Sequence, residues 1–388
     1  MEENEIVKKP FSKAMAVIFG FFVMGFVDLI GISINYVKQD FQLTDTLANL
    51  LGMSLFLWFA ILSIPTALVM NRIGRKKTVL ISMVISLVAM ILPLVHYSFP
   101  MMLAAFTLLG IGNTIIQVSI NPLVSDVVTK QKLTSSLTLG QFIKAIAAFL
   151  APIIAVTAAS RYGDWKLLFL VYSVVCVVCA VWLMLTPIKE APVAQASSGM
   201  GEVFGLLKDP RILLLFLGIV FVVGIDVGLN STVPKFLMER FAIPLEKAGL
   251  GTSLYFIART IGTFVGAILL VKFSSKKFFQ WSMYVAIPAM IIMLFLNHLI
   301  GILIMVFLVG FAVANVFSII FSAALQARPD KGNEISGLMI VGVVGGAIIP
   351  FFMGMLADGF NQTVAMSLLL LLMLYLTYCA FRIPDDIK

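Results

Sequence analysis

Charged residues are scarce in this sequence: only 12% of its 388 positions are Asp, Glu, Lys or Arg. A soluble globular protein carries about 25% charged residues, so this chain lacks the polar surface that a soluble fold of its size needs. Disorder is excluded as well, because a disordered chain combines low hydrophobicity with high charge.

Histidine and cysteine are scarce too, with two and three residues respectively. The cysteines, Cys176, Cys179 and Cys379, all lie in apolar stretches, where a free thiol packs as a small hydrophobic side chain. No His, Cys or carboxylate cluster has metal-ligand spacing, and the HExxH, GxSxG and P-loop motifs are absent from the sequence. We therefore expect no metal site, no cofactor and no enzymatic activity.

Apolar residues, by contrast, make up 61% of the chain, and its mean hydropathy is +1.08. They form continuous runs of about 20 residues, the length of a membrane-spanning helix, whereas a transmembrane β-barrel would alternate apolar and polar residues. The predicted fold is an all-α integral membrane protein with twelve transmembrane helices. The predicted spans are 12–37, 44–70, 78–96, 100–125, 134–160, 165–186, 211–238, 246–271, 278–297, 299–326, 334–357 and 362–381.

One stretch between the spans, 187–210, is polar and rich in Gly, Ser and Ala. It separates six predicted spans from the other six. We therefore expect an N-terminal six-helix bundle at 1–186, a cytoplasmic linker at 187–210 and a C-terminal six-helix bundle at 211–388.

Positive charge is distributed unevenly over the predicted loops. With the N-terminus inside, nineteen of the 27 Lys and Arg residues fall in inner loops, six fall in outer loops, and Lys144 and Arg259 lie within helices. Cytoplasmic loops carry the excess of positive charge in membrane proteins, so both termini are predicted to be cytoplasmic. The same rule explains the net charge of +8 without a nucleic-acid partner.

Several landmarks recur at a spacing of about 200 residues. The matching features are Asp28 and Asp226, Asn113 and Asn315, Pro152 and Pro350, and the loops 71–77 and 271–277. One common spacing predicts a duplicated six-helix unit and two pseudo-symmetric bundles. This plan resembles that of the major facilitator transporters, which bind their substrate near the midplane between the two halves.

The loop 71–77 also resembles the signature of that superfamily, G-x-x-x-D-R-x-G-R-R/K. The signature's Gly and Asp are replaced here by Ala67 and Asn71, while its basic end is intact. The resemblance implies a conformational latch, although the loss of the Asp removes its usual acidic member. The latch residues implied are Arg72, Gly74, Arg75 and Lys76.

Three segments, 112–127, 136–153 and 336–358, resemble the fucose–galactose–glucose:proton symporter branch of the superfamily. The resemblance implies proton-coupled symport of a hexose-like sugar by alternating access in a bacterial inner membrane, and we expect a monomer. Some members have a coupling Glu where Gln117 stands, and their first-span Asp lies further along the helix than Asp28. The proton site therefore cannot be transferred residue for residue.

Four ionisable residues lie well inside predicted spans: Asp28, Lys144, Asp226 and Arg259. Each costs about 2.5–3.5 kcal/mol to insert, so we expect pairing of Asp28 with Lys144 and of Asp226 with Arg259. In the functional interpretation one carboxylate carries the coupling proton, with Asp28 the first candidate and Asp226 the second. In the structural interpretation each pair is a fixed brace.

Carboxamides inside the spans offer donors and acceptors that suit sugar hydroxyls, and two or three of them beside an aromatic ring face make a typical sugar site. Gln117 and Asn121 are four residues apart and share one helix face, as do Gln141 and Lys144 three residues apart. The predicted substrate-binding residues are Gln117, Asn121, Gln141, Lys144, Asn230, Asn315 and Tyr255. An alternative is an anionic sugar or organic acid bound through Lys144 and Arg259, with a proton or sodium as the coupling ion.

Overall fold

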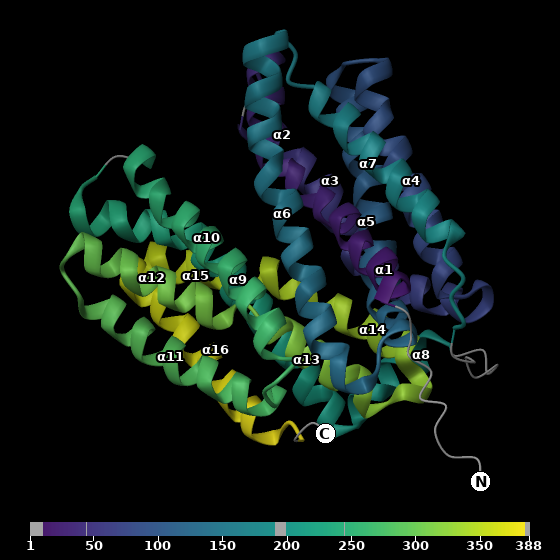
Figure 1. Cartoon of the computed structure of the whole chain (residues 1–388). Helices are drawn as coiled ribbons and strands as arrows, with labels where there is room; N and C mark the ends of the chain where they lie inside the picture. Colours follow the sequence, from purple (N-terminus) through teal and green to yellow (C-terminus); the bar gives the residue numbers. More distant parts are fainter. Residues whose placement is uncertain (1–10, 44, 191–198, 244, 385–388) are drawn as a thin grey trace. The chain divides into compact units, whose positions relative to one another are not determined.

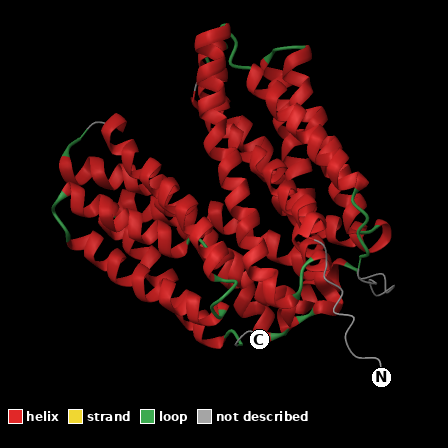
Figure 2. Ribbon diagram, in the orientation of Figure 1, coloured by secondary structure: helices red, strands yellow, loops and turns green. Residues whose placement is uncertain are grey.

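A computed structural model describes residues 11–43, 45–190, 199–243 and 245–384 of the chain, which is drawn in Figure 1. Within these ranges every regular element is a helix (Figure 2), and twelve helical segments are long and apolar enough to cross a membrane. The predicted all-α membrane fold is therefore confirmed. The described residues divide into two compact units, one within Met1–Ser136 and Ile143–Ser197, the other within Leu137–Phe142 and Ser198–Lys388.

The first unit begins with an interrupted span. It consists of α1 (Phe11–Met24), the 3₁₀ segment η1 (Gly25–Leu29) and α2 (Ile30–Asp40). Single helices form the next five spans. These are α3 (Asp45–Ile73), α4 (Arg75–Val95), α5 (Phe99–Val127), α6 (Lys130–Tyr162) and α7 (Leu167–Leu185).

The second unit contains two interrupted spans. Its uninterrupted helices are α9 (Pro210–Phe241), α10 (Leu245–Leu269), α11 (Ser275–Phe295) and α16 (Gln362–Arg382). The tenth span is divided into α12 (Leu299–Val313) and α13 (Val316–Ala327), and the short η3 (Pro329–Lys331) follows it. The eleventh span consists of α14 (Gly332–Val341), the 3₁₀ segment η4 (Gly342–Val344) and α15 (Gly345–Gly359).

The predicted linker, 187–210, is partly helical, which its polar composition did not indicate. It contains α8 (Met200–Gly205) and the 3₁₀ segment η2 (Leu206–Lys208). Val203 and Leu206 are buried, so this short stretch is held by the burial of its apolar side chains.

The two units repeat one pattern of helix packing. In the first unit α5 packs against α3 and α4, and α4 packs against α7. In the second unit α12 packs against α10 and α11, and α11 packs against α16. These are the same pairs counted from the start of each half, so the predicted duplication of a six-helix unit is confirmed.

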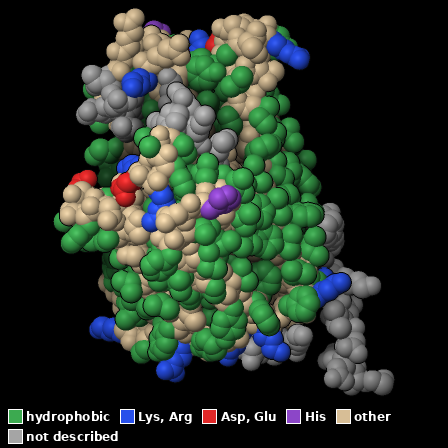
Figure 3. All heavy atoms as spheres, turned by 90° about the vertical axis from the view of Figure 1, so that its left-hand side faces the viewer, with side chains coloured by type: hydrophobic (Ala, Val, Ile, Leu, Met, Phe, Trp, Pro, Cys, Tyr) green, Lys and Arg blue, Asp and Glu red, His purple; other side chains and the backbone are tan. Residues whose placement is uncertain are grey.

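Apolar side chains cover much of the outside of the molecule. Large hydrophobic residues such as Met53, Phe351 and Leu371 are more than half exposed. Figure 3 shows hydrophobic side chains over most of one face, with several Lys and Arg side chains along its lower edge. An apolar surface of this extent suits a protein whose surroundings are lipid.

The loops at one end of the first unit are joined by a polar and aromatic cluster. The Asp40 carboxylate at the end of α2 accepts hydrogen bonds from the Tyr97 hydroxyl (2.5 Å) and from Trp165 Nε1 (2.9 Å). The Tyr36 ring stacks on Trp165 at 4.9 Å. Burial, together with the adjacent Asp40 carboxylate, raises the pKa of Tyr97 above its ordinary value, so its hydroxyl stays protonated and keeps donating.

Close helix packing in the second unit depends on glycine at the interruption of the eleventh span. A Cβ added at Gly345 would collide with the backbone oxygen of Val220 on α9, and one added at Gly342 would lie 3.0 Å from Ile219. Gly354, further along α15, has no neighbouring atom within 4 Å of the same position. Gly345 and Gly354, both on α15, therefore differ sharply in the space available for a side chain.

We predict that Gly345→Ala destabilises the protein by about 1–3 kcal/mol, the usual cost of overpacking. Gly354→Ala on the same helix should leave stability unchanged or raise it by up to about 1 kcal/mol through better helix propensity. Thermal unfolding of the purified protein in detergent, followed by tryptophan fluorescence, measures both effects. Equal melting temperatures for the two variants would contradict the packing described here.

Candidate functional site

Asp28 lies within the interruption of the first span, in η1. A 3₁₀ stretch inside a helix often marks a functional hinge, and three other helices contact this one. From α5, Asn113 Nδ2 donates a hydrogen bond to the backbone oxygen of Met24, at 2.7 Å. From α6, the backbone oxygen of Lys144 comes so close that a Cβ at Gly25 would lie 2.7 Å from it.

The contact from α7 is aromatic. The Tyr172 ring lies 4.7 Å from the Phe26 ring, measured between centroids, and the Tyr172 hydroxyl donates to the backbone oxygen of Ala147 on α6 at 2.5 Å. The interrupted segment around Asp28 is therefore enclosed by neighbouring helices on several sides. Irregular backbone at membrane depth is tolerated where protein covers it.

The predicted ion pair of the first unit, between Asp28 and Lys144, is loose. Lys144 Nζ lies 4.0 Å from Asp28 Oδ2, at the limit of an ion pair. The Asp28 side chain is 42% exposed and the Lys144 side chain is 22% exposed. The Asp28 carboxylate therefore lies near a positive charge and is also exposed at the surface of the protein.

The predicted ion pair of the second unit, between Asp226 and Arg259, is tight. Arg259 Nη1 lies 2.6 Å from Asp226 Oδ2, and the Tyr255 hydroxyl donates to the other carboxylate oxygen, Oδ1, at 2.6 Å. Both oxygens of Asp226 are engaged. The Tyr255 ring is fully buried and packs where Gly310 leaves room on α12.

Tyr255 was predicted as an aromatic surface for a sugar, but this structure places its ring in the core and its hydroxyl on Asp226. Both predicted charge pairs lie within ion-pair distance, while the functions assigned to them stay predictions.

Gln117 and Asn121 both lie buried on α5 and are linked to their own helix. Gln117 Nε2 donates to Asn113 Oδ1 at 2.8 Å, and Asn121 Nδ2 donates to the backbone oxygen of Gln117 at 2.7 Å. Gln141 is half-buried on α6. The carboxamides predicted from the first half thus come from two helices, and those on α5 form a connected series with Asn113.

The predicted residues of the second half have different surroundings. Asn230 is half-buried on α9, and its backbone oxygen accepts a hydrogen bond from Thr252 Oγ1 at 3.0 Å. Asn315 lies between α12 and α13 and is 1% exposed. Its Nδ2 donates to the backbone oxygen of Gly262 at 2.9 Å, and its amide fills the space beside Gly266.

The loop predicted as a latch contacts the ends of two other helices of the first unit. Arg75 Nη1 lies 2.6 Å from Asp126 Oδ1 at the end of α5, and both side chains are buried. Lys76 Nζ donates to the backbone oxygens of Met184 (3.0 Å) and Thr186 (2.8 Å) at the end of α7. Gly74 has φ +91°, a conformation that side chains disfavour. Arg72 lies in the last turn of α3.

Sequence reasoning missed Glu190, which lies just beyond the sixth span. Its carboxylate accepts hydrogen bonds from the backbone N–H groups of Arg75 (2.6 Å) and Lys76 (3.0 Å) at the start of α4. A carboxylate at a helix N-terminus satisfies free N–H groups and the helix dipole. Glu190 thus supplies an acidic group to a loop in which Asn71 replaces the signature's Asp.

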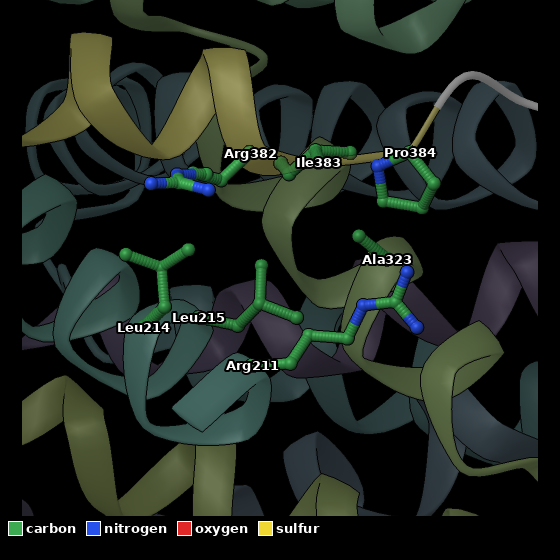
Figure 4. Close-up of a pocket in the computed structure, with 7 residues that line it drawn as sticks. All are labelled: Arg211, Leu214, Leu215, Ala323, Arg382, Ile383 and Pro384. Carbon is green, nitrogen blue, oxygen red and sulfur yellow. The ribbon is translucent and has the colours of Figure 1, made fainter. Parts of the chain in front are cut away.

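A crevice in the second unit lies apart from these residues. It is lined by Arg211, Leu214 and Leu215 of α9, by Ala323 of α13, and by Arg382, Ile383 and Pro384 at and just after the end of α16 (Figure 4). None of the predicted site residues is among them. Within the described residues, no group of three or more His, Cys, Asp and Glu is arranged to hold a metal ion.

Comparisons with known proteins agree with this architecture. The family model described as Major Facilitator Superfamily matches residues 16–350. The glucose/galactose transporter of Brucella abortus is 25% identical over 92% of this chain and 90% of its own length.

Solved structures show the same fold. The E. coli fucose:proton symporter FucP superposes with a TM-score of 0.82 at 16% identity, over 95% of this chain and 97% of that one. The proton:xylose symporter XylE superposes with a TM-score of 0.73 at 14% identity, over 97% and 96%.

We predict that Glu190→Ala destabilises the first unit by about 1 kcal/mol, the usual cost of a lost helix cap. Glu202→Ala is the matched control. Glu202 lies 3.9 Å from Lys331 with its side chain 59% exposed, and surface pairs of this kind contribute little. Thermal unfolding compares the variants, and hydrogen exchange at the start of α4 should rise in Glu190→Ala alone. Unchanged exchange there would show that the carboxylate does not cap this helix.

Proposed function

The chain belongs to the Major Facilitator Superfamily, and on that basis we propose that it is a secondary transporter carrying a hexose-like sugar together with a proton by alternating access. The observation that carries the proposal is the exposed, loosely paired Asp28 on an interrupted helix, enclosed by α5 and α6, which bear the carboxamides. The substrate class is supported by the Brucella abortus relative, which is named a glucose/galactose transporter.

Asp28 has the properties that a coupling carboxylate needs. Its side chain is 42% exposed, and Lys144 Nζ lies 4.0 Å away, which is close enough for an ion pair but too far for a close hydrogen bond. A proton on Asp28 would leave Lys144 without its counter-charge, which changes the balance of charge around η1. Symport follows if the proton and the sugar both favour the same conformational state.

Asp226 is suited to a different role. Arg259 and Tyr255 occupy both of its oxygens with short, charge-assisted hydrogen bonds, the strong class of such bonds. The Asp226 carboxylate therefore has a close partner on each of its two oxygens. We infer that the Asp226–Arg259–Tyr255 cluster is a permanent brace between α9 and α10, while Asp28 releases and takes up the proton.

The sugar-binding groups that we propose come chiefly from the first half. Gln117, Asn121 and Gln141 offer amide donors and acceptors for hydroxyl groups. Lys144 adds a donor close to Asp28. From the second half we retain Asn230 as a proposed contact. The predicted contacts Asn315 and Tyr255 are buried and bonded within their own unit, so we assign them to its framework instead.

An anionic sugar or organic acid would require a cation available for its carboxylate. Arg259 is held by Asp226 at 2.6 Å, and Lys144 has Asp28 beside it. These pairings favour a neutral sugar as the substrate.

We further propose the organisation of the protein in the cell. The excess of Lys and Arg in alternate loops supports cytoplasmic termini, and the relative from the bacterium Brucella abortus supports a bacterial inner membrane. Residues 1–186 and 211–388 then form the two halves that move, joined by a cytoplasmic linker at 187–210. We propose a monomer with a proton, rather than sodium, as the coupling ion.

We predict that Asp28→Asn abolishes sugar accumulation and the pH dependence of uptake, because the substituted amide cannot exchange a proton. Asp226→Asn should instead lower stability by about 2 kcal/mol through weakened hydrogen bonds to a charged group. Uptake and proton flux in proteoliposomes, with thermal unfolding of both variants, separate the two roles. The assignment fails if Asp28→Asn still accumulates sugar against a gradient with wild-type pH dependence.

A substrate panel tests the class of solute. We predict that neutral hexoses drive proton uptake into proteoliposomes, while the corresponding uronic acids do not. Gln141→Ala should weaken hexose binding roughly tenfold, since one good hydrogen bond to a ligand contributes about 1–1.5 kcal/mol. Proton movement driven by uronic acids but not by hexoses would overturn the proposed substrate class, and sodium-dependent, pH-independent uptake would overturn the coupling ion.

A further inference from the structure

Asn113 connects two parts of the proposed site, although it belongs to neither. Its Oδ1 accepts a hydrogen bond from Gln117 Nε2 at 2.8 Å, and its Nδ2 donates to the backbone oxygen of Met24 at 2.7 Å. Both groups of the Asn113 amide are therefore used in a chain that runs from α5 to the first span. Asn113 is 1% exposed, so water does not compete for these bonds.

The Met24 carbonyl, which accepts the last hydrogen bond of this series, lies at the interruption of the first span. Met24 is the last residue of α1, and the 3₁₀ segment η1 that contains Asp28 begins at the next residue. The backbone oxygen of Met24 therefore lies where the first span changes its winding. A displacement of Asn113 would shift the point from which η1 starts, and with it the position of Asp28 relative to Lys144.

Gln117, at the other end of this series of hydrogen bonds, faces the sugar in the proposed function. One N–H of the Gln117 amide is used by Asn113, which leaves the second N–H and Oε1 as groups for a hydroxyl. The side chain is 7% exposed. Because the amide is planar and rigid, a hydroxyl that turns it must also move the N–H that Asn113 accepts.

We propose that Asn113 is a positioning residue that couples occupancy at Gln117 to protonation of Asp28. The inference rests on the proposed function, because it needs a sugar at Gln117 and a proton at Asp28. The coupling runs through three hydrogen-bonded groups, the Gln117 amide, the Asn113 amide and the Met24 carbonyl. It is reciprocal: protonation of Asp28 changes the affinity for sugar by the same factor as sugar changes the affinity for the proton.

The test compares Asn113→Ala with Cys176→Ala. Cys176 lies in the same unit and is also 1% exposed, and its Sγ donates to the backbone oxygen of Met83 on a neighbouring helix at 3.3 Å. Each substitution thus removes a buried side chain that bonds to a carbonyl across helices, but only Asn113 connects Gln117 to η1. Sugar affinity is measured in detergent across pH 5–9 by isothermal titration calorimetry, and sugar counterflow is measured in proteoliposomes.

We expect wild-type affinity to change about tenfold over this range, a typical coupling. Asn113→Ala should bind sugar with an affinity that no longer depends on pH and should retain counterflow, which needs no net proton movement, while losing accumulation. Cys176→Ala should behave as wild type. A pH dependence in Asn113→Ala equal to that of wild type overturns the inference and leaves the proposed function standing.

A second measurement does not depend on any variant. In the wild-type protein, saturating galactose should change hydrogen exchange at residues 25–29, because the proposed chain transmits occupancy to η1. No change at these residues despite sugar binding overturns the inference. Absence of pH-dependent sugar binding and of sugar-driven proton uptake in the wild type would instead overturn the proposed function, and the inference with it.

Discussion

A charge or an unpaired backbone group inside a bilayer must find its partner within the protein, because the hydrocarbon core offers none. The carboxylates of Asp28 and Asp226 both obey this constraint, but to different degrees. Asp226 has two close donors, one for each oxygen, whereas Asp28 has a single amine 4.0 Å away. Asp28 is therefore the less fully compensated of the two charges, which is the geometric ground on which we propose it, rather than Asp226, as the group that changes state.

The same constraint governs the interruptions of the spans. Each interruption occurs where another element approaches closely: Asn113 at the first span, the Gly262 carbonyl at the tenth, and the Val220 backbone at the eleventh. Two of these contacts use an asparagine amide and one uses the absence of a side chain at Gly345. These contacts cover the interruptions with protein, where irregular backbone is tolerated inside a membrane.

The sequence was sufficient to predict the spans, the duplication and the two charge pairs. Hydropathy, the spacing of repeated residues and the presence of charges inside apolar runs can all be identified in the sequence itself. It could not predict η1, since GFVDL contains no proline to mark a break in the helix. Glu190 was invisible for another reason: its partners are backbone N–H groups over a hundred residues away, which have no sequence signature. The position of the Tyr255 hydroxyl depends on the packing of its ring beside Gly310.

Duplication explains why the two halves have the same residue types at matching positions, and later divergence explains why these residues make different contacts. Asn113 and Asn315 occupy matching positions and each donates to a carbonyl on a neighbouring helix. In the first half that carbonyl ends α1, next to the segment of Asp28; in the second it lies within the continuous helix α10. One half has thus placed its interruption at the carboxylate, while the other has kept its carboxylate on the unbroken α9 with Arg259 and Tyr255 fixed around it. A transporter needs one group that changes charge and a frame that does not, and divergence of a single ancestral unit is sufficient to provide both.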